Sequence, residues 1–384
     1  MPLRVLLESL PVPASLTSPK YRVTKKTFLL PLIGLAAFFI YIYIFNVDIL
    51  QIIAKVQQID LGSYVLAAAA VVLDTLFFTL TWDSLLRFLS VKVSVAKLYL
   101  FVWVGVFIDT MIPAESVSGE ITKIYLVNRE QIGTAGKATA SIVAQRLIGM
   151  GINLATLLMG ATFLVYERQF YGTLFTLILF LVGLTVFFLA FLLLLCFREN
   201  WTLRFVDALL RLVERVSRGR WKASHFRGEL MEAAKSFHVA MKEYVHAPKT
   251  LAAAFLLSAV SWVLALLAFY FTFVSIGYPQ ISWGAILVIS SIFAAVKSVP
   301  VGVPFEVGLP EITLTTMLIL FGVPAEVSAT ATILMRLLTL WMRFFIGFAA
   351  QQWVGMRTIA TNGNGKVLKD DVSNDGEHKN RVNP

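Results

Sequence analysis

Long runs of apolar side chains set the strongest limit on how this chain can fold. A helix crosses a bilayer with about 20 consecutive apolar residues, and six segments reach roughly that length. Hydrophobic residues make up 58% of the chain and charged residues only 15%, too few charges to cover a soluble surface. This composition excludes a soluble enzyme, a secreted disulfide scaffold and a nucleic-acid-binding protein. We predict an all-α polytopic membrane protein with about six full spans, at Phe28–Phe45, Tyr64–Thr81, Ala138–Tyr166, Phe170–Phe197, Leu251–Phe273 and Val327–Val354.

Four shorter apolar pieces form two pairs, and each pair flanks a break that contains proline, glycine and glutamate. The breaks run from Pro113 to Glu120 and from Pro300 to Glu311. We predict two helical hairpins, 99–127 and 283–322, that enter the membrane and return on the same side. Irregular backbone at membrane depth survives only where protein or a polar cavity satisfies its hydrogen bonds. The residues expected to shape the hairpins are Pro113, Gly119, Pro300, Gly302, Pro304, Gly308 and Pro310.

Basic residues gather in two regions that we expect to face the cytoplasm. Residues 1–27 carry five basic side chains and one acidic, and residues 198–248 carry ten basic and six acidic. The positive-inside rule places both regions on the cytoplasmic side, and six spans with two non-crossing hairpins place both termini there. Residues 28–355 then form the transmembrane domain, and the polar tail 356–384 is expected to be disordered. We interpret 198–248 as an amphipathic helix on the inner leaflet or as a docking site for a cytosolic partner.

One stretch of sequence occurs twice. Pro113–Thr122 aligns without a gap on Pro304–Thr313, and nine of the thirty positions that begin there are identical. An arginine follows in each copy: Arg146 in the first and, after a one-residue slip, Arg336 in the second. With the hairpins entering from opposite sides, the pattern predicts an inverted repeat, with which many transporters build a midplane site. The alternative is that two membrane hairpins share a small-residue turn by chance.

Charged side chains inside the apolar segments are the candidate functional residues, because a charge at mid-membrane is costly and usually faces a cavity or a partner. The two Glu–Arg sets of the repeat are expected to neutralise one another. Their spare guanidinium donors suit a lipid phosphate, which arginine binds bidentately. The alternative is that the pairs are purely structural. The predicted substrate-binding residues are Glu120, Lys123, Arg146, Glu311 and Arg336.

Two further charges inside the apolar segments invite separate interpretations. Asp74 is either a proton-linked acid or a hydrogen-bonding partner in helix packing. Arg343 follows Arg336 by seven residues on the same helical face, and we expect it to snorkel to the inner surface. The single cysteine and the four histidines show no metal-ligand spacing, and HExxH, GxSxG and P-loop motifs are absent. We expect no metal, no cofactor and no catalytic activity.

These residues resemble those of a known family. The first hairpin has Pro113, Gly119, Glu120 and Lys123, followed by Ala140 and Arg146, and the second has Pro300-Val-Gly-Val-Pro, Val-Gly-Leu-Pro-Glu311, Phe321-Gly-Val-Pro and Arg336. Over roughly residues 28–355 the pattern is similar to the flippase-like transmembrane region of lysyl-phosphatidylglycerol synthases, which also occurs in stand-alone bacterial and archaeal membrane proteins. The resemblance implies a helical bundle with re-entrant hairpins that moves a phospholipid or lipid-linked headgroup between leaflets.

This chain departs from the family pattern in three ways. Lys123 stands where the pattern has arginine, and Pro310 interrupts the glycine-rich approach to Glu311. Only about thirty residues follow the last expected span. We therefore expect neither the soluble aminoacyl-transferase domain of the full-length synthases nor lipid aminoacylation.

Three functions remain open from the sequence. The favoured one is a lipid translocase of the cell membrane that binds an anionic or lipid-linked headgroup between the hairpins. The second is an accessory membrane protein that supports an envelope-lipid or glycan enzyme, cytosolic or membrane-bound, through 198–248. An integral-membrane transferase is the weakest of the three, since no catalytic constellation is visible. We expect no nucleic-acid partner.

Overall fold

The computed structural model describes residues 57–111, 117–166, 172–204, 207–208, 227–297 and 308–355, which contain helices and no strand. Five helices are long and apolar enough to cross a membrane. They coincide with five of the six expected spans, whereas the sixth, at 28–45, lies outside the described residues, as do 1–27 and 356–384. The five are α4 (Leu61–Phe88), α7 (Ala135–Tyr166), Ile178–Phe197 of α8 (Gly172–Phe197), α11 (Pro248–Ser275) and Ala325–Gly355.

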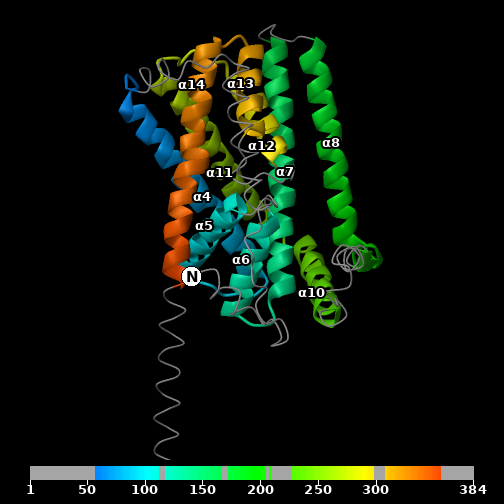
Figure 1. The fold of residues 1–384 in the computed structure, drawn as a ribbon. Helices are drawn as coiled ribbons and strands as arrows, with labels where there is room; N and C mark the ends of the chain where they lie inside the picture. The colour runs from blue at the N-terminus through cyan, green and yellow to red at the C-terminus, as the bar shows by residue number, and fades with distance from the viewer. Residues whose placement is uncertain are drawn as a thin grey trace, which may run out of the picture.

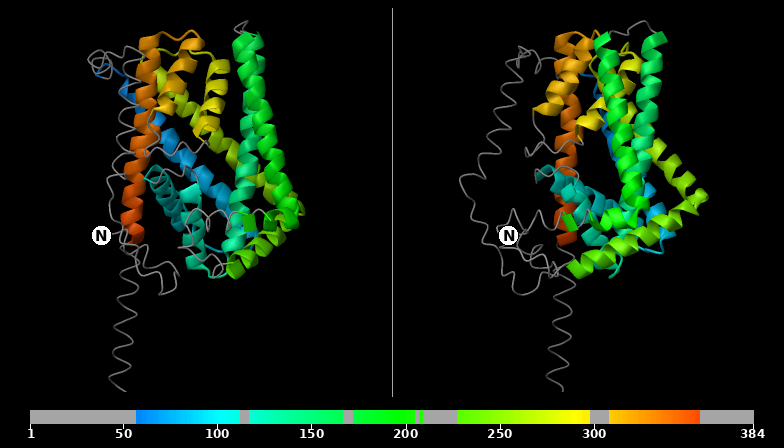
Figure 2. Two further views of the ribbon diagram at one scale, coloured as in Figure 1. Left: turned by 45° about the vertical axis from the view of Figure 1, so that its right-hand side comes forward. Right: turned by 90° about the vertical axis from the view of Figure 1, so that its right-hand side faces the viewer.

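Four shorter helices stand where the sequence predicts the hairpins. Helix α5 (Val95–Met111) packs against α6 (Val117–Glu130), and α12 (Trp283–Lys297) packs against α13 (Leu309–Leu320). In Figure 1 the first pair lies in the lower half of the bundle and the second in the upper half, and both views in Figure 2 agree. The links within each pair lie outside the described residues, and they contain Pro113, Pro300, Gly302 and Pro304.

Glu120 and Glu311, the glutamates of the repeat, lie inside helices and not in the breaks predicted from the sequence. Glu120 is in the first turn of α6 and Glu311 in the first turn of α13. A negative charge is favourable there because the helix N-terminus carries a partial positive charge. Glu311 also caps its helix, since its Oε2 accepts the N–H of Gly308 at 2.6 Å. Gly308 has φ of 106°, a backbone conformation that glycine adopts without a Cβ clash.

Helix α4 is held along α11 and at the centre of the largest apolar cluster. Its cap residue Asp60 accepts two N–H groups of the first turn and donates its own N–H to Ser275 O, at the end of α11, at 2.8 Å. Trp82 of α4 and Trp103 of α5 are both buried in the cluster.

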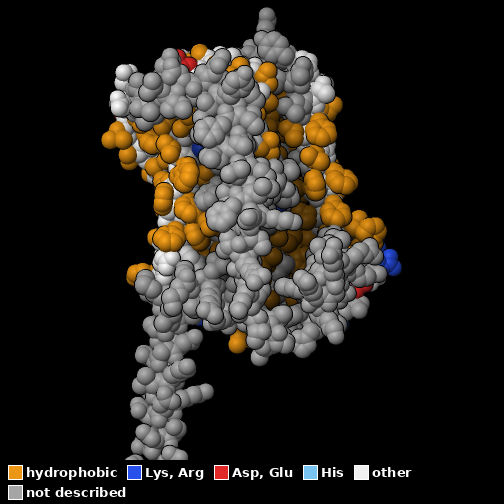
Figure 3. All heavy atoms as spheres, in the orientation of Figure 1, with side chains coloured by type: hydrophobic (Ala, Val, Ile, Leu, Met, Phe, Trp, Pro, Cys, Tyr) orange, Lys and Arg blue, Asp and Glu red, His pale blue; other side chains and the backbone are white. Residues whose placement is uncertain are grey.

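Apolar side chains cover both flanks of the face shown in Figure 3, as expected for surfaces that meet lipid.

Helix α10 (Arg227–Val245) lies within the basic segment 198–248, of which residues 205–206 and 209–226 lie outside the described residues. It packs against α7 and α8. Tyr244 donates its hydroxyl to Leu85 O at 2.9 Å, and His238 Nδ1 lies 3.0 Å from Cys196 O. The apolar side of this amphipathic helix therefore covers the bundle itself. Contact of its other side with a leaflet or a partner stays a prediction.

The first short helix of each sequence repeat crosses the long helix of the other repeat at a glycine. A Cβ on Gly160 of α7 would lie 2.9 Å from the Cβ of Leu287 in α12. A Cβ on Gly347, in Ala325–Gly355, would lie 2.6 Å from Trp103 O and 2.9 Å from the Cβ of Phe107 in α5. These distances leave no room for a Cβ at either glycine, so the absence of a side chain permits each close crossing.

Candidate functional site

Glu311 and Arg336 form a buried ion pair between α13 and α14 (Ala325–Arg336). Arg336 Nε lies 2.6 Å from Glu311 Oε1, and the two side chains are only 5% and 6% exposed. Because the other oxygen of Glu311 caps α13, both carboxylate oxygens are held. Such a pair is stable only while both charges are present, since either charge alone would be buried without compensation.

Glu120 and Arg146 form the corresponding pair between α6 and α7. Arg146 Nη2 lies 2.9 Å from Glu120 Oε1, but the Arg146 side chain is 40% exposed and that of Glu120 is 25% exposed. The pairing expected from the repeat is therefore confirmed in both copies. The Glu311–Arg336 pair is closed from solvent, and the Glu120–Arg146 pair is partly open to it. A role for either pair in binding a substrate stays a prediction.

Lys123 lies one turn after Glu120 on α6 and is buried. Its ammonium Nζ lies 5.3 Å from the ring centroid of Phe78 and 5.5 Å from that of Trp82, both on α4. The faces of aromatic rings attract cations at such distances. The Lys123 charge also interacts with the carboxylates of Glu120 and Asp109. Rings and carboxylates together hold this buried cation.

Asp109 of α5 completes the charged group around α6 and was not among the predicted site residues. Its Oδ1 accepts the Gly119 N–H at 2.6 Å and the Ser118 hydroxyl at 2.8 Å. A Cβ on Gly119 would collide with the Asp109 carboxylate and with Gly105 O. Gly119 therefore permits the close approach of α6 to α5, and its role in shaping a re-entrant hairpin stays a prediction. The signal for Asp109 was a single acid in an apolar run, and its partners depend on the fold.

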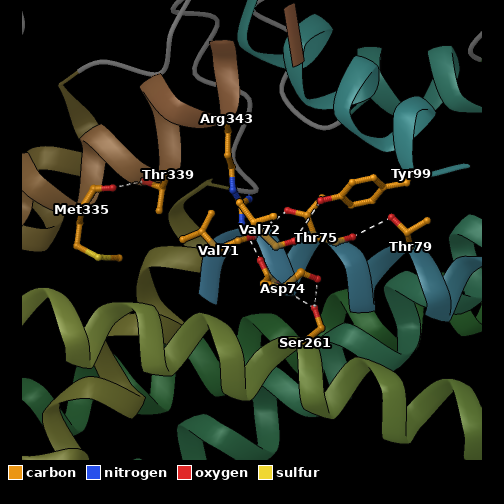
Figure 4. Close-up of polar contacts among 10 residues, drawn as sticks. All are labelled: Val71, Val72, Asp74, Thr75, Thr79, Tyr99, Ser261, Met335, Thr339 and Arg343. Carbon is orange, nitrogen blue, oxygen red and sulfur yellow. Dashed lines mark hydrogen bonds and ion pairs between the residues drawn. The ribbon is translucent and has the colours of Figure 1, made fainter. Parts of the chain in front are cut away.

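Asp74 joins three long helices (Figure 4). Its Oδ2 lies 2.6 Å from Arg343 Nη2, and its Oδ1 accepts the Ser261 hydroxyl at 2.5 Å. These contacts link α4 to α11 and to the Ala325–Gly355 helix. The prediction that Arg343 snorkels to the surface is wrong, because a carboxylate within reach in a low-dielectric interior attracts the guanidinium more strongly than distant water. The contacts fit the packing interpretation of Asp74, and proton linkage stays a prediction.

A π-helical segment, η3 (Leu337–Met342), separates the two arginines of the last span. In a regular α-helix, residues seven apart point in nearly the same direction. The wider π turn changes that relation. Accordingly Arg336 meets Glu311 of α13, whereas Arg343 meets Asp74 of α4. The shared helical face was predicted from regular α-helical spacing, which η3 interrupts.

The last features of the site concern Pro310 and possible metal ligands. Pro310 lies in the first turn of α13, where its missing N–H costs no helical hydrogen bond, and Gly308 precedes it. Within the described part of the chain, no group of three His, Cys, Asp or Glu residues is placed to hold a metal ion.

Comparison with known proteins identifies the family. Residues 31–347 match the family described as the lysylphosphatidylglycerol synthase TM region. A UPF0104 membrane protein of Pyrococcus horikoshii is 22% identical over 84% of this chain and 95% of its own length. Similar UPF0104 membrane proteins from Methanothermobacter thermautotrophicus and Methanocaldococcus jannaschii are 26% and 21% identical, over 74% and 86% of this chain and 84% and 95% of their own lengths. These three relatives are stand-alone archaeal forms, and the chain belongs to the family of lysylphosphatidylglycerol synthase transmembrane regions.

Proposed function

We propose that this protein is a lipid translocase that moves a phospholipid or lipid-linked headgroup between the two membrane leaflets. The observation that carries the proposal is the duplicated ion pair. Glu120–Arg146 and Glu311–Arg336 are related by the sequence repeat, and they belong to helix pairs in opposite halves of the bundle (Figure 1). The unequal exposure of the two pairs fits a transporter that opens one end at a time.

The proposal includes a topology. The pairs α5–α6 and α12–α13 act as re-entrant hairpins of an inverted repeat, and both termini face the cytoplasm. Two observations support this arrangement: the opposite placement of the helix pairs (Figure 2) and the reciprocal crossings at Gly160 and Gly347. A pseudo-two-fold axis in the membrane plane produces such reciprocity, because each half repeats the packing of the other.

The headgroup binds first where a pair is already accessible. Arg146 presents a partly exposed guanidinium that can donate two parallel N–H groups to a phosphate. Glu120 then gives up its present contact with Arg146. Opening of the other end exposes the Glu311–Arg336 pair, which performs the same exchange toward the opposite leaflet. The protein is a transporter in this proposal and catalyses no bond-breaking step.

An accessory role is the second candidate, and one observation bears on it. The basic segment 198–248 includes α10, which is docked on the bundle but leaves Val239 and Val245 exposed. A partner enzyme that binds this surface would make α10, and not the ion pairs, the functional element. Substitutions in the ion pairs therefore separate the two functions.

The test is lipid translocation in proteoliposomes. Phospholipids carrying a fluorophore on an acyl chain are reconstituted with the protein, and dithionite quenches the label in the outer leaflet. Wild type should lose signal rapidly beyond the outer-leaflet fraction. Arg146→Gln should slow that loss at least about tenfold, because one charge-assisted contact is removed.

A matched control comes from an ion pair at the helix surface. Lys97 Nζ lies 2.5 Å from Glu130 Oε2, and both side chains are more than a third exposed, at 43% and 35%. Lys97→Gln should transport like wild type. Wild-type traces equal to those of protein-free vesicles, across anionic and zwitterionic lipids and with an imposed proton gradient, would refute translocation and favour the accessory role.

A further inference from the structure

Four charges lie together where α5, α6 and α7 meet, and they balance. Asp109 and Glu120 supply two carboxylates, and Lys123 and Arg146 supply two cations. Asp109, Lys123 and Arg146 each interact by charge with Glu120. The described residues of this site therefore carry no net charge. A ligand that adds a charge would upset the balance inside the membrane, where an uncompensated charge is costly.

The four charges are not equally available to a ligand. Lys123 is buried, its Nζ lies over the rings of Phe78 and Trp82, and its charge interacts with those of Glu120 and Asp109. Glu120 and Arg146 are partly exposed, and so is Asp109, whose Oδ1 is held by the Gly119 N–H and the Ser118 hydroxyl. A ligand can therefore exchange with the Glu120–Arg146 pair while Lys123 stays in place.

The exchange discriminates between headgroup charges. An anionic headgroup that takes the Arg146 guanidinium leaves the Glu120 carboxylate without its present partner. A headgroup that carries both a phosphate and a primary ammonium replaces both partners, since the phosphate accepts from Arg146 and the ammonium donates to Glu120. We propose that the Glu120–Arg146 pair receives a zwitterionic phospholipid headgroup of this kind, an inference that rests on the proposed lipid translocation.

The repeat-related pair supports the same ligand class. Glu311 and Arg336 again supply one carboxylate and one cation, and they are closed from solvent. A ligand that satisfies one pair on one side of the membrane can satisfy the other pair in the same way. Neither end then needs an additional counter-charge to release or accept the headgroup.

The experiment compares headgroups in the dithionite assay, with the fluorophore on the acyl chain so that each headgroup is intact. Wild type should move phosphatidylethanolamine at least about tenfold faster than phosphatidylglycerol, which corresponds to about 1.4 kcal/mol. Phosphatidylcholine should fall between them, because its quaternary ammonium carries the charge but donates no N–H hydrogen bond to Glu120. Equal rates for all three lipids, or faster movement of phosphatidylglycerol, would overturn the proposal. Movement of none of them would instead overturn lipid translocation.

A charge-neutralising variant makes the test sharper. Glu120→Gln leaves the site with one excess positive charge, so transport of phosphatidylethanolamine should fall and that of phosphatidylglycerol should rise. Glu130→Gln makes the same substitution in the exposed pair with Lys97 and should keep the wild-type order. An unchanged order in Glu120→Gln contradicts the proposed contact. If that variant does not fold, the wild-type headgroup series still decides the matter.

A soluble headgroup distinguishes a lipid ligand from a small zwitterion. Glycerophosphoethanolamine has the same phosphate and ammonium without acyl chains. Vesicles loaded with it should retain it in the presence of the wild-type protein. Its release at the rate of phosphatidylethanolamine movement would show that the site takes free zwitterions, and the assignment of a lipid ligand would be wrong.

Discussion

Neutralising Glu311 should destabilise the protein far more than neutralising Glu120. Glu311→Gln keeps an oxygen that can accept the Gly308 N–H, so the cap of α13 can survive. What it removes is the charge opposite Arg336, whose side chain is only 5% exposed. Breaking a buried pair in this way costs about 3–5 kcal/mol, because the remaining charge stays buried without compensation. Because the entropy of unfolding grows with chain length, 1 kcal/mol corresponds to roughly 1–2 °C for a chain of this size, and the melting temperature should fall by roughly 3–10 °C.

The partly open Glu120–Arg146 pair provides the comparison. Arg146 is 40% exposed, so solvent can screen it after Glu120→Gln. An exposed pair contributes about 0–1 kcal/mol, and a loss near the upper end of that range corresponds to a fall of only about 1–2 °C. The assay is thermal unfolding in detergent micelles, followed by intrinsic tryptophan fluorescence. Equal losses in the two variants would refute the argument from burial.

A double variant tests the cause of the loss. Glu311→Gln combined with Arg336→Met removes both charges, so no uncompensated charge stays buried. The double variant should therefore regain most of the melting temperature that Glu311→Gln loses. If it is no more stable than the single variant, the uncompensated charge is not the cause. A stable double variant that fails to move lipid would separate the functional role of the pair from its structural one.

Two further predictions concern helix packing. Gly347→Ala should lower the melting temperature, because its Cβ would lie 2.6 Å from Trp103 O and overpacking costs about 1–3 kcal/mol, more than the gain of about 1 kcal/mol in helix propensity. Gly183→Ala, which would meet nothing within 4 Å, should be neutral or stabilising, and a similar loss in both would contradict the close crossing. Asp74→Asn should lower the melting temperature less than Glu311→Gln, since Arg343 is 25% exposed. It should leave any effect of a proton gradient on transport unchanged, and loss of that effect would instead make Asp74 a proton-linked acid.

The sequence predicted the described spans and the two Glu–Arg pairs. Both depend on signals that a linear chain carries directly, namely the length of an apolar run and the spacing of repeated residues. The arginine of the second copy was found despite its one-residue slip because Glu311 and Arg336 each had a counterpart in the first copy. The residues whose spacing predicted an amphipathic helix in 198–248, at 209–216, lie outside the described residues, and the described helix α10 packs its apolar side against the bundle.

What the sequence missed depends on tertiary packing. The π-helical segment η3 has no distinctive composition, yet it interrupts the regular helical spacing between Arg336, which meets Glu311, and Arg343, which meets Asp74. The difference in exposure between the two pairs was equally hidden, because both copies supply the same residue types. Asp109 carried only the weak signal of an acid among apolar residues, and the close approach of α5 and α6 at Gly119 gives it its role.

In the proposed translocation, the unequal exposure of two chemically equivalent pairs suggests how the two conformations can have similar free energies. If the halves are related by an inverted repeat, closing the Glu120–Arg146 pair and opening the Glu311–Arg336 pair yields a second conformation with a similar set of contacts. The two states then differ little in free energy, as rapid exchange between them requires. Separating the charges of a closed, buried pair without a ligand leaves each of them uncompensated, which is costly. In the proposed cycle a zwitterionic headgroup offsets that cost at either end, so that movement of lipid and movement of protein would be coupled.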